Sequence, residues 1–352
     1  MPLAQRIRDS IRVNGPMPVS LYMLMCLHDP EHGYYATRPS FNRDFTTAPE
    51  TSQVFGELIG LWAAHEWLAM GSPESVRLVE LGPGRGVMMY DMLRAARAAP
   101  GFADAVRVTM IEASPALRRA QQERLVGRTL EYFPDLEAVP PGPAIIVGNE
   151  FLDCLAIRQY VRDGNGWRER AVGLAAGDEL VFGLGPAAEL PERIIPVGDQ
   201  VEVAPGLDAI VEIIARRFRK DPGRALFLDY GPDDGSPGDT LRAFRQGAQV
   251  DPLTDPGACD LTADVDFPRL RQIGLREGLA VHGALRQGHF LSRLGVWERA
   301  KRLGAANPAR ASEITAGVST LTAPEEMGAR FKAICFAPQG APAPAGFQGS
   351  AP

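Results

Sequence analysis

The chain has 352 residues, enough for two domains or one large domain with additions. Its 45% hydrophobic and 23% charged residues are typical of a globular protein that can build a sizeable core. The 37 lysines and arginines against 43 aspartates and glutamates give a net charge of −6, which argues against a chain that binds nucleic acid or an anionic membrane over its whole surface. No apolar run approaches the ~18 residues needed to cross a bilayer, so we expect no membrane span.

Four cysteines lie far apart in the sequence, at Cys26, Cys154, Cys259 and Cys335. A disulfide framework or a zinc site would need clustered cysteines, so we expect reduced thiols in a cytosol-like compartment. His28 and His32 have the spacing of metal ligands on a helix, but Pro30 between them would break that helix. The sequence therefore predicts no metal site.

Residues 1–75 are expected to form a helical and irregular segment ahead of the main sheet. Thr47-Ala-Pro-Glu50 is typical of a capping box, with proline tolerated in the first helical turn. The helix that follows is expected over Thr51–Ala69. Its apolar residues form a stripe too wide for a helix lying alone on a surface, so we expect this helix to pack within the core.

From residue 76 onward, short apolar strands alternate with helices. The expected strands are Arg77–Leu81, Val106–Ile111, Ala144–Val147, Ala225–Leu228 and Phe331–Phe336, and the expected helices between the first of them are Val87–Ala98 and Pro115–Val126. Strands that alternate with helices of this length indicate βαβ units and a mostly parallel sheet. The sequence therefore predicts an α/β fold with a Rossmann-like sheet.

An insertion interrupts this alternation after residue 155. Its expected parts are a meander of Ile157–Arg162, Trp167–Val172 and Glu179–Phe182, and a helix over Leu207–Lys220. We interpret the chain as a helical segment with a covering loop (1–75), a cofactor-binding core (76–155), the inserted β/α subdomain (156–224) and the remainder of the core sheet (225–336). The tail (337–352) is rich in Pro, Ala and Gly and is expected to be disordered.

A glycine-rich turn follows the first of these strands. Glu80-Leu-Gly82-Pro-Gly84-Arg-Gly86 ends that strand and precedes a helix. Glycines at such a turn let the backbone approach a ligand, and the helix N-terminus offers free N–H groups. A tight structural turn would have the same appearance, so the motif needs further support.

The spacing of the glycines separates two classes of cofactor. Dinucleotide-binding folds have G-x-G-x-x-G, whereas here the third glycine comes one residue early and Val87 takes its expected place. The acidic-x-Gly-x-Gly-x-Gly spacing instead resembles the first motif of class I S-adenosylmethionine (SAM) methyltransferases. Their next signal is an acidic residue after the second strand that holds ribose hydroxyls, and Glu112 occupies this position. SAM is therefore favoured over a nicotinamide dinucleotide.

Polar residues also follow the strand Ala144–Val147, in the segment Asn149-Glu150-Phe151-Leu152-Asp153. Ligands of open α/β sheets bind beyond the carboxyl ends of the strands, so we expect the polar side chains of this segment to face the ligand. If the chain turns helically, Glu150 and Asp153 share one face. The same residues could instead only cap a turn.

Further segments occur along the chain in a specific order: Gly33-Tyr34-Tyr35, Asp44–Glu50, Gln53–Leu58, Glu80–Gly86, Asn149–Asp153, Asp229-Tyr230-Gly231, Asp260–Phe267, Gly288–Leu291 and Phe331-Lys332. Together they resemble the MidA-type SAM methyltransferases, a family that includes the mitochondrial complex I assembly-factor protein-arginine methyltransferase. The resemblance covers almost the whole chain. It implies a class I methyltransferase sheet with an N-terminal helical extension and an inserted subdomain.

The resemblance also implies an activity, a cofactor and a site. It implies methyl transfer from SAM to a protein arginine, with a respiratory complex I subunit as a candidate substrate and no nucleic-acid partner. The residues implied at the methyl-transfer site are Glu150, Asp153 and Asp44. The implied cofactor-binding residues are Glu80, Gly82, Gly84, Gly86, Glu112, Asn149, Thr46, Thr47 and Glu50. The implied acceptor-side residues are Asp229, Tyr230, Asp260, Thr262 and Asp266.

The chain departs from the family pattern at four positions: Arg43, Ala204, Pro232 and Gly247. The cofactor half is expected to be intact, whereas the acceptor half leaves two alternatives open, a methyltransferase for small molecules and a SAM-binding assembly factor without catalysis. The recognisable family segment begins near Arg6, and Asp9 is atypical of a transit peptide. We therefore expect a cytoplasmic protein of the bacterial type.

Overall fold

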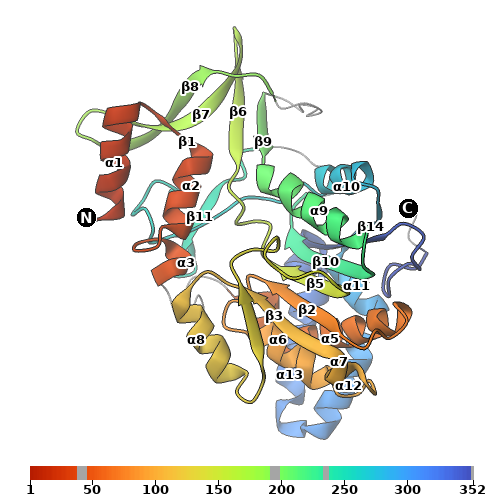
Figure 1. The fold of residues 1–352 in the computed structure, drawn as a ribbon. Coiled ribbons are helices and arrows are strands. Elements are labelled where there is room, and N and C mark those ends of the chain that lie inside the picture. Colours follow the sequence, from red (N-terminus) through yellow and green to blue (C-terminus); the bar gives the residue numbers. More distant parts are fainter. Residues whose placement is uncertain (38–45, 191–198, 233–237, 350–352) are drawn as a thin grey trace.

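The computed structural model describes residues 1–37, 46–190, 199–232 and 238–349 (Figure 1). Its α-helices are α1 (Leu3–Asn14), α2 (Val19–His28), α3 (Tyr34–Thr37), α4 (Ala48–Thr51), α5 (Gln53–Ala69), α6 (Val87–Ala96), α7 (Phe102–Ala105), α8 (Pro115–Arg124), α9 (Pro205–Phe218), α10 (Phe267–Arg276), α11 (Gln287–Arg293), α12 (Val296–Ala306) and α13 (Ala311–Thr322). Its strands are β1 (Met17–Pro18), β2 (Val76–Leu81), β3 (Val106–Ile111), β4 (Leu130–Phe133), β5 (Ala144–Asn149), β6 (Arg158–Asp163), β7 (Gly166–Leu174), β8 (Leu180–Ala187), β9 (Gln200–Val203), β10 (Gly223–Tyr230), β11 (Arg242–Arg245), β12 (Ala248–Val250), β13 (Asp260–Thr262), β14 (Leu279–Arg286) and β15 (Phe331–Pro338).

The main sheet has seven strands in the order β14-β15-β10-β5-β2-β3-β4. From β10 to β4 neighbouring strands are parallel, whereas β15 pairs antiparallel with both β10 and β14. The five strands expected from the sequence are β2, β3, β5, β10 and β15 of this sheet. The prediction of a mostly parallel, Rossmann-like sheet is confirmed.

Helices cover both faces of the main sheet, because strand residues alternate between two cores. On β10, Leu226 and Leu228 join the core that includes α5, α6 and α13, whereas Ala225 and Phe227 join the core that includes α9 and α10. Trp62 of α5 is 1% exposed, as the wide apolar stripe of this helix predicts. The carboxyl ends of the parallel strands remain available for a site.

The insertion forms a second, antiparallel sheet of β6, β7, β8 and β9, to which β1 adds by pairing with β7. In Figure 1 this sheet lies at the top of the molecule, with α1 and α2 beside it. Met23 of α2, Val172 of β7 and Leu261 of β13 belong to one hydrophobic cluster. The N-terminal segment is therefore packed against the insertion. In the part of the chain that is described, no helix has the length and apolar character needed to cross a membrane.

The expected capping box is wrong. The side chain of Thr47 makes no capping hydrogen bond to the short helix α4, and Ser52 instead caps α5 by accepting a bond from the N–H of Val54. The carboxylate of Glu50 accepts two bonds from Arg85, at 2.6 and 3.1 Å. Glu50 therefore forms an ion pair with Arg85 of the glycine-rich turn instead of a local capping bond, because the two segments meet in the fold.

The expectation of a disordered tail is also wrong for residues 337–349. The N–H of Ala345 donates to the buried carboxylate of Glu66 at 2.9 Å. The ring of Phe347 is 1% exposed and lies 5.0 Å from the ring of Phe290. One buried aromatic ring and one bond to a buried charge anchor a segment whose composition is typical of disorder.

Candidate active site

A cavity of about 660 Å³ lies beyond the carboxyl ends of β2, β3 and β5. This is where ligands bind in open α/β sheets, and the volume is within the range of small-molecule sites. Its wall contains expected site residues from five segments: Thr47, Glu50, Glu80, Gly82, Gly84, Glu112, Asn149, Glu150, Asp153 and Asp260. The fold therefore brings together most of the residues that the sequence singled out.

The glycine-rich turn is built on left-handed backbone. Gly82 and Gly84 have φ of +60° and +50°, a conformation that other residues rarely adopt. A Cβ atom at Gly82 would lie 3.0 Å from the ring of Phe151, whereas one at Gly84 would meet no atom within 4 Å. Gly84 thus leaves its backbone open to the cavity, while Gly82 makes room for a side chain of the cavity wall. Gly86 is the N-cap of α6 and does not line the cavity.

Two buried carboxylates lie at the carboxyl ends of β2 and β3, Glu80 within β2 and Glu112 directly after β3. Burial raises the pKa of Glu80 well above its usual range, and its Oε2 has no hydrogen-bond partner among the described residues. Glu112 accepts a bond from the N–H of Ser114 at 2.8 Å, and burial raises its pKa as well. The amide of Gln121 reaches both Glu112 Oε2 at 3.3 Å and the carbonyl of Gly84 at 2.6 Å. One side chain therefore joins the glycine-rich turn to the acidic residue after the second strand.

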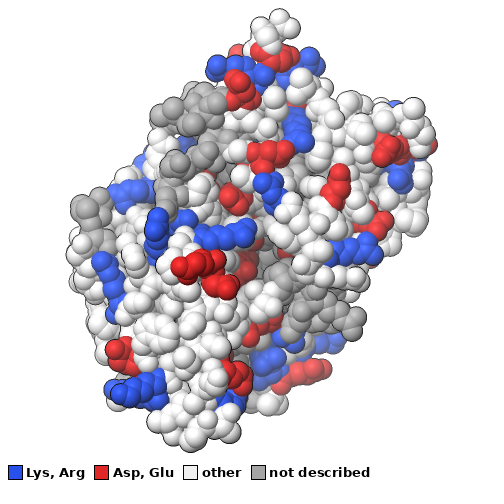
Figure 2. Space-filling view, turned by 180° about the vertical axis from the view of Figure 1, so that it is seen from behind, with Lys and Arg blue, Asp and Glu red and all other residues white. Residues whose placement is uncertain are grey.

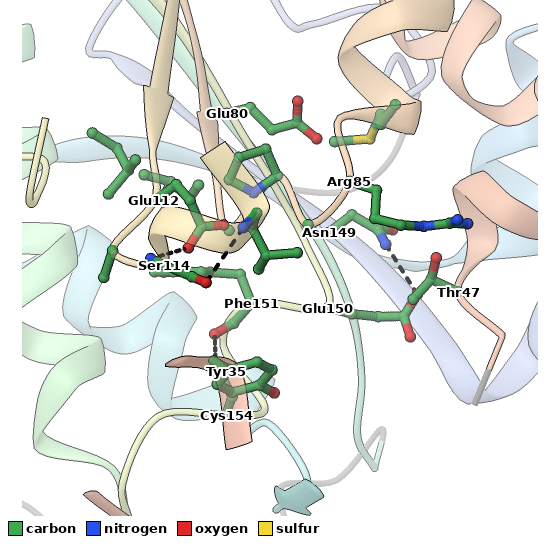
Figure 3. A pocket seen from close by; sticks show the side chains of 18 of the residues that line it. Tyr35, Thr47, Glu80, Arg85, Glu112, Ser114, Asn149, Glu150, Phe151 and Cys154 are labelled. Carbon is green, nitrogen blue, oxygen red and sulfur yellow. Dashed lines mark hydrogen bonds between the residues drawn. The ribbon is translucent and has the colours of Figure 1, made fainter. Parts of the chain in front are cut away.

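Glu150 is held in a constrained position after β5. Its φ of +49° is unusual for a residue with a side chain. Its Oε1 accepts a bond from the N–H of Ala48 at 3.1 Å. The same oxygen accepts a bond from the amide of Asn149 at 3.0 Å (Figure 3). Burial, with a further contribution from Asp153, raises the pKa of Glu150 to about 8. The carboxyl group is therefore poised to exchange a proton near neutral pH.

Asp229 stabilises the turn after β5 by accepting hydrogen bonds from its backbone. Its Oδ2 accepts bonds from the N–H groups of Phe151, Leu152 and Asp153, at 3.1, 2.8 and 3.3 Å. Asp229 is 1% exposed and does not line the cavity. Its observed contacts thus hold the segment that carries Glu150 and Asp153.

Hydroxyl groups donate hydrogen bonds to the carboxylates of Asp153 and Asp260. Thr262 donates to Asp153 Oδ2 at 2.9 Å, and the hydroxyl of Tyr230 bonds to that of Thr262. Burial raises the pKa of Asp153 to about 6. Tyr35 donates to Asp260 Oδ1 at 2.8 Å. Asp153 and Asp260 line the cavity, whereas Tyr230 and Thr262 lie behind them.

Other expected residues lie elsewhere. Thr46 is exposed and is not part of the cavity wall. Asp266 caps α10 by accepting a bond from the N–H of Arg269 at 2.9 Å, and it lines a separate small cavity of about 30 Å³. Asp44, and with it Arg43, falls outside the described residues. The structure thus contradicts a place in the main cavity for Thr46 and Asp266, because the first faces solvent and the second is used as a helix cap.

Sequence reasoning missed several residues of the wall: His28, Tyr35, Arg85, Phe151, Cys154, Ile210 and Ile213. Tyr35 stands in the segment Gly33-Tyr34-Tyr35, which was noticed without a role for its side chains. Ile210 and Ile213 lie on α9, at the end of the insertion, and no local signal connects them with the glycine-rich turn.

The polar atoms of the wall suit a ligand that carries hydrogen-bond donors. Glu80 Oε2 and Asn149 Oδ1 are both buried, and neither has a partner among the described residues. A buried acceptor without a donor is costly, so a donor-bearing ligand would satisfy both atoms. The hydroxyls and the amino group of SAM are donors of this kind.

The chain is similar to known methyltransferases over most of its length. A family model for S-adenosyl-L-methionine-dependent methyltransferases matches residues 58–285. The mitochondrial protein arginine methyltransferase NDUFAF7 homolog of Drosophila melanogaster is 36% identical over 377 residues, which cover 96% of this chain and 85% of that protein. The mitochondrial protein arginine methyltransferase NDUFAF7 of Homo sapiens is 33% identical over 370 residues, covering 96% and 83%. A crystal structure of a Burkholderia thailandensis protein bound to S-adenosyl-homocysteine superposes with a TM-score of 0.84 at 26% identity, covering 98% of this chain and 93% of that one.

These relatives correct one expectation and confirm others. A cytoplasmic location is contradicted, because the curated relatives are mitochondrial proteins. The predicted fold, the SAM cofactor and the enzymatic class are confirmed. The chain belongs to the family of S-adenosyl-L-methionine-dependent methyltransferases that includes the mitochondrial protein arginine methyltransferases.

Proposed function

We propose that this methyltransferase transfers a methyl group to the guanidinium of an arginine in a protein substrate. The observation that carries the proposal is the set of carboxylates Glu150, Asp153 and Asp260 in the same cavity as the glycine-rich turn. A guanidinium has a pKa of about 12.5–13.8, so it arrives charged and must lose a proton around the transfer. Carboxylates bind its planar fork with two hydrogen bonds and can accept that proton.

The cofactor half of the cavity has a role for each polar group. SAM supplies an activated methyl group on a sulfonium when it is bound. Glu112 would accept hydrogen bonds from the ribose hydroxyls, and the backbone at Gly84 would allow close approach. Glu80 Oε2 and Asn149 Oδ1, which have no partner among the described residues, would accept hydrogen bonds from donors of the cofactor. The side chains Leu136, Ile210 and Ile213 give the wall an apolar part that suits an adenine ring.

Glu150 is the group that we assign to proton acceptance. A general base is most effective when its pKa lies near the working pH, and the pKa of Glu150 is raised to about 8. The bonds from Ala48 and Asn149 both reach Oε1, so this oxygen is held in place. Asp153, with a pKa of about 6, is ionised at neutral pH and supplies negative charge for the guanidinium.

A protein substrate is favoured over nucleic acid by the charge of the surface. On the face shown in Figure 2, basic and acidic side chains are interspersed over the described residues, in keeping with the net charge of −6. Nucleic-acid binders concentrate basic residues on one face. The names of the curated relatives also favour a protein arginine. Within that class, the family resemblance points to a subunit of respiratory complex I.

Transfer of a labelled methyl group tests the proposal. The protein is incubated with methyl-labelled SAM and a mitochondrial extract, which is then separated by size, and labelled proteins are analysed by mass spectrometry. Label on arginine of a protein is the expected result, and loss of that label with Glu150→Gln assigns it to this enzyme. Label only in small molecules would favour the small-molecule alternative. Binding of S-adenosyl-homocysteine without any transfer would favour the non-catalytic one.

A further inference from the structure

Two segments that are far apart in the sequence are joined by an ion pair at the wall of the cavity. Glu50 belongs to α4, and Arg85 belongs to the glycine-rich turn between β2 and α6. Nε and Nη2 of Arg85 both donate to Oε1 of Glu50, at 3.1 and 2.6 Å. The side chains of Arg85 and Glu50 are 26% and 16% exposed, so water screens this pair less than a pair on the open surface. The pair therefore forms a defined link between α4 and the turn.

The turn that carries Arg85 is held from its other side by α8. The carbonyl of Arg85 accepts a bond from Nε of Arg124 at 3.0 Å, and the carbonyl of Gly84 accepts one from the amide of Gln121 at 2.6 Å. Figure 3 shows the side chain of Arg85 extending toward the side of the pocket where Glu150 lies. Arg85 thus combines a fixed backbone with a side chain that reaches across to α4.

The helix α4 in turn contacts the proton acceptor. The N–H of Ala48, its first residue, donates to Oε1 of Glu150 at 3.1 Å. A helix of four residues without a side-chain cap does not hold its position alone, so its contacts decide where it lies. It packs against α5, α6 and α13, and the ion pair with Arg85 adds a charged contact on the side of the cavity. A chain of bonds therefore runs from the glycine-rich turn through α4 to Glu150.

Glu150 also lies among acidic side chains from three elements. Asp153 belongs to the same turn, Glu50 approaches from α4, and Asp229 of β10 interacts with Glu150 as well. Negative charge nearby disfavours ionisation of a carboxyl group, and Asp153 and Glu50 both raise the pKa of Glu150. Asp153 and Asp229 accept bonds from neutral hydroxyl and N–H groups, whereas Glu50 is paired with a guanidinium. Arg85 thus offsets one of the charges that oppose ionisation of the proton acceptor.

We propose that Arg85 is a positioning residue for Glu150, because its ion pair with Glu50 fixes the helix that holds the Glu150 carboxylate and neutralises the charge that this helix brings beside it. This inference rests on the proposed function, since Arg85 acts through the proton acceptor and not on the reacting atoms. It also couples the two halves of the site. The turn that is expected to contact the cofactor sets the position of the group that receives the proton.

Titration of the Glu150 carboxyl group tests the inference without requiring turnover. The protein is labelled with carbon-13 at the glutamate carboxyl groups, saturated with S-adenosyl-homocysteine and followed by NMR, and the signal lost in Glu150→Gln identifies the group. Arg85→Met leaves the charge of Glu50 unopposed, so the titration midpoint of about 8 should move up by about one pH unit. Glu50→Gln removes that charge, so the midpoint should move down.

The pH profile of methyl transfer gives a second readout. In Arg85→Met the kcat/KM at pH 7 should fall about tenfold through the shifted midpoint, and the plateau at high pH should also fall because the carboxylate is less well oriented. Arg85→Lys keeps the charge but not the fork of two donors, so it should restore the midpoint and only part of the plateau. Arg158→Met is the matched control and should change neither readout. Arg158 makes a two-bond pair with Glu169, at 2.8 and 2.7 Å, and does not line the cavity.

Opposite shifts of the midpoint in Arg85→Met and Glu50→Gln are the expected result. An unchanged midpoint in both variants, or shifts in the same direction, would overturn the inference. Loss of affinity for S-adenosyl-homocysteine in Arg85→Met with a normal titration of Glu150 would overturn it as well, because Arg85 would then be a ligand of the cofactor. If the midpoints shift in opposite directions but no protein arginine is methylated, the proposed function fails while the link from Arg85 to Glu150 stands.

Discussion

Replacing Glu150 by glutamine tests the proton acceptor directly. Glutamine keeps the size of the side chain and an acceptor oxygen for the N–H of Ala48, but it cannot take a proton. Because the bonds that hold Glu150 involve this oxygen, the turn after β5 should keep its shape. We expect the variant to bind S-adenosyl-homocysteine as the wild type does and to lose turnover.

The raised pKa sets the size of the effect on rate. A carboxyl group with a pKa of about 8 is ionised in about one tenth of the free enzyme molecules at pH 7 and about one hundredth at pH 6. The kcat/KM of the wild type should therefore rise about tenfold per pH unit and level off above pH 8. Proton transfer by a positioned side chain contributes about 10²–10⁴-fold to the rate. The kcat/KM of Glu150→Gln should therefore be lower by that factor and should no longer rise with pH.

The same pKa has a consequence for stability. Because the pKa of Glu150 is higher in the folded state than the ordinary value of 4.5, the folded state binds a proton more tightly than the unfolded chain. The contribution of Glu150 to the free energy of unfolding is fully present below pH 4.5 and is lost as the pH rises through about 8. At 1.36 kcal/mol per pH unit its upper limit is ~5 kcal/mol. The free energy of unfolding should therefore fall less between pH 5 and pH 9 in Glu150→Gln than in the wild type.

Two measurements test the role of Glu150 in proton acceptance and its effect on stability. Methyl transfer is followed from pH 6 to pH 9 for both proteins, and urea unfolding is measured at pH 5 and pH 9. Glu123→Gln is the control, because Glu123 is exposed on α8 and should behave as the wild type. Wild-type kcat/KM in Glu150→Gln at pH 7, or an unchanged rise of its rate with pH, would refute the role assigned to Glu150.

Three further changes have effects that the contacts predict. Gly84→Val forces a branched side chain into left-handed backbone and toward the cofactor, so calorimetry should show loss of S-adenosyl-homocysteine binding with a stability cost of only about 1–2 kcal/mol; unchanged affinity would contradict this. Arg224→Met leaves the carboxylate of Glu66 buried without the 2.8 Å partner it has now, and urea unfolding should show a loss of about 3–5 kcal/mol. Phe347→Ala opens a cavity beside Phe290 and should cost about 3–5 kcal/mol, whereas a disordered tail would make the change silent in thermal unfolding.

The elements that could be predicted are those whose signals are local. The strands β2, β3 and β5 are short apolar runs, and the glycine-rich turn and Glu112 follow two of them directly. Their carboxyl ends meet at one edge of the sheet, so the composition of the cavity wall followed from the order of the elements. The capping prediction failed where a distant partner, Arg85, competed for Glu50.

The residues that could not be predicted depend on contacts between distant segments. Tyr35 reaches the site because α2, which precedes α3, packs beside β13, and its bond to Asp260 joins positions 225 residues apart. Phe347 is buried because it packs into the main core, where it meets Phe290 and His282, and a composition rich in Pro and Gly gave no sign of it. Burial against partners far along the chain overrides local propensity in both cases.

The place of β15 in the sheet has a consequence for synthesis of the protein. The ribosome produces β10 and β14 before β15, although β15 lies between them in the sheet. Until β15 emerges, each of these two strands presents an open edge that can recruit a strand from another polypeptide. A nascent chain that pauses before Phe331, or one that a premature stop codon ends upstream of this point, therefore carries open strand edges that favour aggregation.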